Sequence, residues 1–190
     1  MTISTGAKRE RVAEPSVESS ASAVEWSAIT AGALAAIGVS IIISTLASGA
    51  GLAWVRPWSF SGPSPATFGV AAAIGLIVTQ WIASALGGYL TGRLRIKWVG
   101  IRTDEIFFRD TAHGFLAWAL ATLFMAAVLS LIAAGTVADT GTEAIVTPEA
   151  AEQASKVAAS YSFFTSLSFL VGAFIACVAG ALGGYHRDEV

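Results

Sequence analysis

Charged and uncharged positions are strongly segregated along this chain. An α-helix rises about 1.5 Å per residue, so about 20 apolar residues cross the hydrocarbon layer of a bilayer. A transmembrane β-barrel would instead show segments of about ten alternating residues, and that pattern is absent. Four stretches of about 28 to 36 residues contain no Asp, Glu, Lys or Arg, and they lie between Glu25 and Arg56, Arg56 and Arg93, Asp110 and Asp139, and Lys156 and Arg187. The pattern therefore predicts an all-α membrane protein with four transmembrane helices.

The expected boundaries follow from these stretches and from local start signals. Thr103, followed by Asp104 and Glu105, starts a helix that leads into the third span. Pro148 stands at the first position of another helix. We expect transmembrane helices over about 26–54, 66–92, 111–137 and 158–185, with a helical extension over 148–157 outside the membrane. Residues 1–24 are expected to form a disordered cytoplasmic tail, 25–186 the transmembrane domain and 187–190 a second cytoplasmic tail.

Composition and charge strengthen this picture and add an orientation. Hydrophobic residues make up 55% of the chain and charged residues only 13%, whereas soluble domains carry about 25% charged residues. Nine of the eleven basic residues lie in the N-terminal tail, the middle loop and the C-terminal tail, and only Arg56 and Lys156 lie in the two alternate loops. The positive-inside rule therefore places both termini on the cytoplasmic side, in a bacterial inner membrane.

The second and fourth predicted helices end in nearly the same motif. Residues 83–89 read ASALGGY and residues 179–185 read AGALGGY, so six of seven positions are identical. A weaker likeness joins 32–35 of the first helix to 114–117 of the third. Two hairpins related by an axis along the membrane normal would explain both matches. The expected arrangement is two like-oriented helical hairpins with an internal repeat.

Small residues recur at four-residue spacing in the predicted helices. Small faces let helix backbones approach closely, which is how helices associate when lipid removes the hydrophobic drive between them. Spacing alone does not say whether the neighbouring helix belongs to the same chain or to another subunit. The expected helix-packing residues are Gly32, Ala36, Ser40, Ser84, Gly88, Gly92, Gly172, Ala176, Gly180 and Gly184.

Two polar residues are candidates for function. Gln80 lies in the middle of the second span, where its amide needs a hydrogen-bond partner on another helix; a pore-lining or ligand-binding role is the alternative. His113 follows Asp110 by three residues and Arg109 by four, so the three can share one helix face. Its imidazole would suit an interfacial hydrogen bond, or else pH sensing or metal or haem ligation.

The segment after the second span alternates basic and apolar residues. Such a segment can lie on the membrane surface, with cations toward anionic lipid headgroups and apolar side chains dipping inward. We expect headgroup contacts from Arg93, Arg95, Lys97 and Arg102, with Leu94, Ile96 and Trp98 toward the lipid interior.

Signatures of catalysis and of ion coupling are lacking in the sequence. It contains no phosphate loop, nucleophile elbow or HExxH motif, and no span holds a carboxylate pair. Ion-driven carriers usually place ionisable groups at membrane depth. The single Cys177 allows neither a disulfide framework nor a zinc cluster within one chain. We therefore expect no enzyme activity, cofactor, metal site or nucleic-acid partner.

Short motifs in the first three spans resemble a group of bacterial multi-pass membrane proteins, common in alphaproteobacteria, some of which carry the label PhnA-like. The motifs are 26–29 (WSAI) with 31–33 (AGA), 87–89 (GGY) with 92–94 (GRL), and 113–115 (HGF) with 118–120 (WAL). The likeness covers about residues 26 to 135 and implies no known activity. What it implies is a closely packed, hydrogen-bonded helix junction near the cytoplasmic edge, involving Gly88, Tyr89, Arg93, His113, Gly114 and Trp118.

Three functional hypotheses remain open at this point. The leading one is a non-catalytic membrane protein that acts by helix–helix association, as an accessory subunit of a larger membrane complex or as a homo-oligomer. The second is a small oligomeric channel or facilitator for a neutral solute, built around Gln80. The third is a lipid- or stress-responsive membrane protein that uses its middle loop on anionic headgroups.

Overall fold

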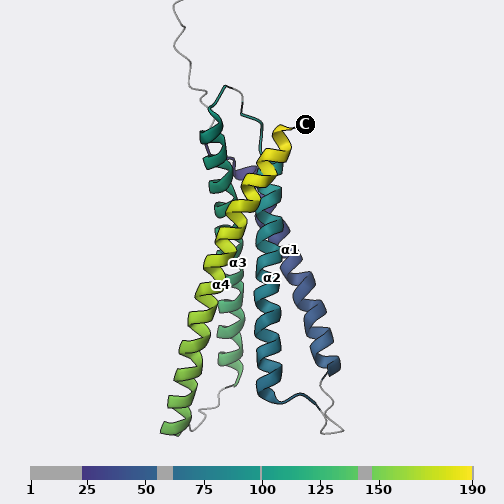
Figure 1. Cartoon of the computed structure of the whole chain (residues 1–190). Coiled ribbons are helices and arrows are strands. Elements are labelled where there is room, and N and C mark those ends of the chain that lie inside the picture. The colour runs from purple at the N-terminus through teal and green to yellow at the C-terminus, as the bar shows by residue number, and fades with distance from the viewer. Residues whose placement is uncertain (1–22, 55–61, 99, 141–146, 190) are drawn as a thin grey trace, which may run out of the picture.

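The computed structural model describes residues 23–54, 62–98, 100–140 and 147–189. In these residues the chain is helical, without strands, and four helices are long and apolar enough to cross a membrane. The predicted all-α transmembrane fold is thus confirmed. The helices are α1 (Trp26–Trp54), α2 (Pro65–Leu94), α3 (Thr103–Thr140) and α4 (Pro148–Asp188), shown in Figure 1.

Helix starts follow the expected local chemistry. The Ser64 side chain caps α2 by accepting a hydrogen bond from the Thr67 amide at 3.2 Å, and Pro65 occupies the first turn. α3 begins at Thr103, with Asp104 and Glu105 in its first turn, so the expected start signal and the third span form one helix. The predicted extension over 148–157 is likewise continuous with the fourth span in α4.

The helices converge at one end of the bundle and separate toward the other (Figure 1). We call the first the closed end, which contains the start of α1, the end of α2, the start of α3 and the end of α4; the other is the open end. α2 and α3 each contact all three other helices, whereas no Cα atom of α1 comes within 8 Å of one in α4 in the described residues. α1 therefore lies at an edge of the bundle.

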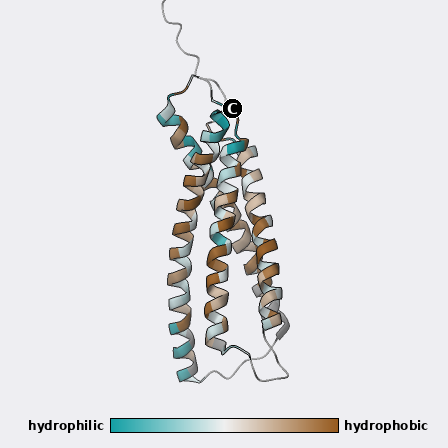
Figure 2. Ribbon diagram, turned by 45° about the vertical axis from the view of Figure 1, so that its right-hand side comes forward, coloured by the Kyte–Doolittle hydropathy of each residue, from teal (hydrophilic) through white to brown (hydrophobic). Residues whose placement is uncertain are grey.

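Side-chain size divides the interior from the surface. Of the ten buried hydrophobic residues of the described chain, nine are alanine and the other is Ile29. Large apolar side chains face outward instead, such as Leu34 (68% exposed) and Leu131 (74%). Figure 2 shows hydrophobic residues along most of the helices and hydrophilic ones near their ends. Outward apolar side chains over the spans are what a surface in contact with lipid requires.

Glycine backbones form the tightest contacts of the closed end. A methyl group added at Gly92 would overlap the carbonyl oxygen of Gly180, and one added at Gly114 would overlap that of Ala176. The expected small-residue rows therefore lie against neighbours within the same chain. Nine of the ten expected helix-packing residues are buried, namely Gly32, Ala36, Ser84, Gly88, Gly92, Gly172, Ala176, Gly180 and Gly184, and Ser40 is half-buried.

The two halves of the predicted repeat make different contacts. Gly32 of α1 packs on the backbone of Gly87 in α2, which it approaches closely enough to leave no room for a side chain. In the predicted repeat, Gly114 of α3 corresponds to Gly32, and Gly183 of α4 corresponds to Gly87. Gly114 packs on Ala176 and Gly180, which lie earlier in α4 than Gly183. The repeat thus remains a prediction from the sequence, without matching contact registers.

Candidate functional site

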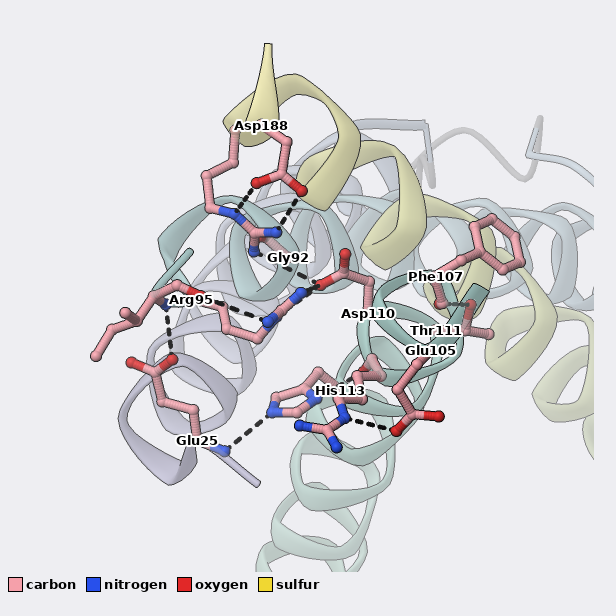
Figure 3. Close-up of polar contacts among 12 residues, drawn as sticks. Glu25, Gly92, Arg95, Glu105, Phe107, Asp110, Thr111, His113 and Asp188 are labelled. Carbon is pink, nitrogen blue, oxygen red and sulfur yellow. Dashed lines mark hydrogen bonds and ion pairs between the residues drawn. The ribbon is translucent and has the colours of Figure 1, made fainter. Parts of the chain in front are cut away.

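A buried ion pair joins α3 to the segment that follows α2. Arg95 Nε donates a hydrogen bond to Asp110 Oδ1 at 2.6 Å, and a second guanidinium nitrogen of Arg95 pairs with the same oxygen. The two side chains are 0% and 3% exposed. Figure 3 shows them between the ends of α2, α3 and α4. A buried charge is stable only beside an opposite charge, and Arg95 and Asp110 provide that for each other.

The end of α4 joins this pair through a second arginine. Arg187 Nη1 lies 3.6 Å from Asp110 Oδ1 and donates to the carbonyl oxygen of Gly92 at 3.0 Å. Its other nitrogens bind the two carboxylate oxygens of Asp188, at 3.0 and 3.1 Å. A side chain at Gly184 would overlap the Asp110 carboxylate, so this glycine makes room for it. We call Arg95, Asp110, Arg187 and Asp188 the ion-pair cluster.

His113 ties the start of α1 to α3. Its Nδ1 lies 2.6 Å from the Arg109 carbonyl oxygen, and its Nε2 accepts the Glu25 amide N–H at 2.9 Å. A carbonyl oxygen can only accept, so Nδ1 carries the proton, and Nε2 must keep its lone pair. The contacts therefore specify a neutral imidazole in a single tautomer. The Glu25 carboxylate in turn accepts the Ile96 amide at 2.7 Å.

The Trp98 ring lies against two guanidinium groups. The guanidinium carbons of Arg95 and Arg109 are 5.3 and 4.7 Å from its ring centroid, within the range of cation–π attraction. Arg109 also binds Glu105 one turn earlier at 2.7 Å. These contacts hold the connection between α2 and α3 against the bundle.

The paired charges of the ion-pair cluster hold the helix ends together. Burial lowers the pKa of the Arg95 guanidinium, and the hydrogen bond to Asp110 acts in the opposite direction. Because the ordinary arginine pKa exceeds about 12, Arg95 stays charged at neutral pH. Removal of one partner from a buried pair costs about 3–5 kcal/mol. The charged groups of the cluster pair with one another, so its geometry supports a role in holding the helices together.

The expected headgroup role is wrong for Arg95. This side chain points inward to Asp110 and is 0% exposed. Leu94 and Ile96 point outward, 56% and 73% exposed, as side chains in contact with lipid do. The physical reason is that the buried Asp110 carboxylate needs a countercharge, which the alternating segment supplies. Lys97 and Arg102 are exposed, and Arg93 is half-buried.

The other predicted site residues lie in two places. Tyr89 Oη is 3.4 Å from His186 Nδ1 at the closed end, where Asp110 and His113 are also buried. Gln80 and Trp118 lie apart from them, on the wall of a cavity between the four helices. The structure thus brings Asp110 and His113 together in the closed end and separates them from Gln80 and Trp118.

Sequence reasoning missed three contributors to the closed end: Glu25, Arg187 and Asp188. Glu25 and Arg187 border charge-free stretches and Asp188 lies in the C-terminal tail, positions that by themselves indicate only where a span ends. One signal could have identified a partner for Asp110, because a carboxylate one or two turns inside a membrane helix needs a countercharge. The sequence offers several arginines for that role and does not choose among them.

Comparison of the chain with protein-family models, with curated proteins and with solved structures gave no match. What the protein does is therefore inferred from its own residues and their geometry. Four long apolar helices make it a multi-pass membrane protein.

Proposed function

We propose that the protein is a non-catalytic component of the bacterial inner membrane that acts by binding transmembrane helices, as an accessory subunit of a larger complex or as a homo-oligomer. Both termini face the cytoplasm in this proposal, as the distribution of basic residues indicates. The observation that carries it is a pair of α1 glycines, Gly38 and Gly49, with open space where a side chain would stand.

Glycine in a helix interior costs about 0.5–1 kcal/mol relative to alanine. At the closed end this cost is offset, because glycines such as Gly92 let two backbones touch. Gly38 and Gly49 have no such compensation, since outside the adjacent backbone of α1 itself no described atom lies within 4 Å of an added Cβ at either position. A helix from outside the chain would supply the missing contact.

The two glycines share one face of α1. They are eleven residues apart, about three helical turns, and Ala36, which is buried against α2, lies on roughly the opposite side of the helix. We call this surface the outer face of α1; it consists of Leu34, Gly38, Ile42, Thr45, Gly49 and Leu52. Small positions between large apolar ones allow close backbone approach by a second apolar helix.

The remainder of the structure presents this face outward. Glu25 and His113 fix the start of α1, and Gly32 packs on α2. α4 makes no close approach to α1 in the described residues, so one side of α1 is left uncovered at the edge of the bundle (Figure 1). Leu34 and Leu52 are 68% and 74% exposed there.

Purification in mild detergent followed by native mass spectrometry tests this proposal. We expect the wild-type chain to retain a partner or a second copy, and Gly38→Leu with Gly49→Leu to purify as a folded monomer. Gly69→Leu is the matched control, because that glycine of α2 is also open but lies on another helix. A solitary wild-type monomer, or a double variant that keeps its partner, contradicts the proposal.

Lys97 and Arg102 have a secondary place in the proposal. Both are exposed beside the closed end, which is expected to face the cytoplasm, where anionic lipids attract basic side chains. We propose that both contact anionic headgroups, while Lys97 Nζ also donates to the Asp188 carbonyl oxygen at 3.2 Å.

A further inference from the structure

A central cavity of about 430 Å³ lies between the four helices, on the open-end side of the tight glycine contacts. Its wall is mainly apolar, with hydroxyl and amide groups that include those of Gln80, Ser84, Thr122, Thr165 and Ser168. No described charged side chain lines it. Both its size and its composition are those of small-molecule sites, which typically measure about 300–1,000 Å³ and carry a few polar groups on apolar walls.

Three polar atoms of this wall gather at one point, beside Gly172 of α4. Measured from the position where a Cβ of Gly172 would stand, Ser84 Oγ is 3.1 Å away. From the same position, Gln80 Nε2 and the indole nitrogen of Trp118 are each 3.2 Å away. A methyl group at this position would press on all three, so glycine gives them the most room. Gly172 therefore lets three polar side chains of the cavity wall come together at one place.

The donors at this point have no partner within the described chain. Trp118 Nε1 is buried and makes no hydrogen bond, and the Gln80 carboxamide makes none either among the described residues. The Ser84 hydroxyl donates to the Gln80 carbonyl oxygen at 2.7 Å, so Ser84 Oγ is left as an acceptor only. Of these donors the Gln80 carboxamide is the one that faces the cavity, and a bound acceptor would supply the hydrogen bond that it lacks.

We propose that this cavity binds a neutral amphiphile whose head carries a carbonyl group. The carbonyl oxygen accepts a hydrogen bond from the Gln80 amide, and the apolar body lies along the alanine and leucine walls between the helices. A head that also carries an N–H or O–H donates to Ser84 Oγ. Charged heads are excluded, because the wall offers no countercharge and an unpaired charge at this depth is costly.

The closed end makes this a binding site instead of a passage. Gly87 and Gly88 line the cavity, and beyond them backbones touch, with Gly88 against Ala176 and Gly87 against Gly32. The ion-pair cluster follows. A solute that entered from the open end would meet this packed region, so the neutral-channel hypothesis requires the closed end to open.

The site does not depend on the proposed association through α1. The cavity is lined by the inner side of α1, at Ala36, Ser40 and Ser44, whereas Gly38 and Gly49 belong to the outer face. Loss of a partner in the Gly38→Leu, Gly49→Leu variant and loss of ligand in a cavity variant are therefore separate results.

Photoaffinity labelling of the full chain in lipid nanodiscs tests the proposal, with a diazirine-bearing octadecanamide as the probe. We expect saturable labelling of cavity residues such as Met125 and Thr165. Unlabelled octadecanamide should compete, and ionised stearate should compete about tenfold less well, which corresponds to about 1.4 kcal/mol. Gln80→Leu should lower labelling by a similar factor without lowering Tm, because it removes a polar group that has no partner in the chain.

Gln153→Leu is the matched control, since that glutamine is exposed on α4 near its start, and it should label as the wild type does. Thr122→Phe provides a second route, because its ring would fill the cavity without altering Gln80. Labelling that does not saturate, or that falls equally on lipid-facing residues such as Leu131, overturns the proposal. Labelling of Gln80→Leu and of Thr122→Phe at the wild-type level also overturns it.

Discussion

At the closed end, α1, α2, α3 and α4 meet through glycine backbones and buried charges, whereas on the outer face of α1 the glycines have open space beside them. Gly92 and Gly180 touch through their backbones, but nothing approaches Gly38 or Gly49. The same residue type therefore serves two purposes. At the closed end glycine builds the chain's own fold, and on the outer face of α1 it leaves a surface for another helix.

The largest effect expected at the closed end comes from its central carboxylate. Asp110→Ala leaves Arg95 charged and buried without its partner, so we expect a loss of about 3–5 kcal/mol in the free energy of unfolding. Thermal unfolding in detergent measures it, and Asp104→Ala, at an exposed carboxylate, is the control. Joint replacement of Asp110 by Leu and Arg95 by Met should recover much of the loss, because it removes both charges. An Asp110→Ala variant as stable as the control would show that the pair does not fasten the helices.

Glycine substitutions compare the two regions directly. A methyl at Gly92 overlaps the Gly180 carbonyl, so Gly92→Ala should cost about 1–3 kcal/mol through overpacking. Gly49→Ala should instead leave the isolated chain unchanged or stabilise it by about 0.5–1 kcal/mol. Denaturation of both variants in detergent measures the difference. Equal responses would mean that the closed end is not tightly packed.

The His113 contacts predict a dependence on pH. Protonation of Nε2 would place an N–H opposite the Glu25 amide N–H and abolish that hydrogen bond. Since the folded contacts require the neutral ring while an unfolded imidazole binds a proton below about pH 6.5, stability should fall as pH drops through that range. His113→Phe should be less stable at neutral pH by about 1–2 kcal/mol for its two lost hydrogen bonds and should lose this part of the pH slope. An unchanged slope in that variant would contradict the assigned tautomer.

The smallest effect is expected at the exposed basic residue of the loop. Arg102 pairs with Asp104 at 3.5 Å, but the two side chains are 87% and 90% exposed. Such pairs contribute little in water. Arg102→Ala should therefore leave Tm unchanged, and a clear drop in Tm would mean that the loop contributes to the closed end through this residue.

Apolar length alone sufficed to predict the number of helices and their approximate positions, because a membrane span needs about 20 uncharged residues in any sequence context. The side toward which Arg95 points could not be predicted in this way. Alternation of Arg93, Leu94 and Arg95 fits either an inward or an outward arginine, and the choice is made by Asp110, fifteen residues later on another helix.

Small-residue spacing also predicted only some of the roles of the glycines. It marked Gly88, Gly92 and Gly180 as packing positions, and the structure buries all three. Gly38 and Gly49 fall outside the four-residue rows, so the spacing gave no reason to select them. Their open surroundings are a property of the assembled bundle, as is the meeting of Gln80 and Trp118 near Gly172.

Photo-crosslinking from the outer face of α1 tests the proposed association most directly. A photoreactive amino acid at Thr45, between the two open glycines, would be irradiated in native membranes and the products identified by mass spectrometry. The same residue at Leu170 of α4, which is 70% exposed, is the control. We predict a discrete protein adduct from Thr45 that disappears when Gly38 and Gly49 are both replaced by Leu. Lipid adducts alone from Thr45, as from Leu170, would contradict helix association through α1.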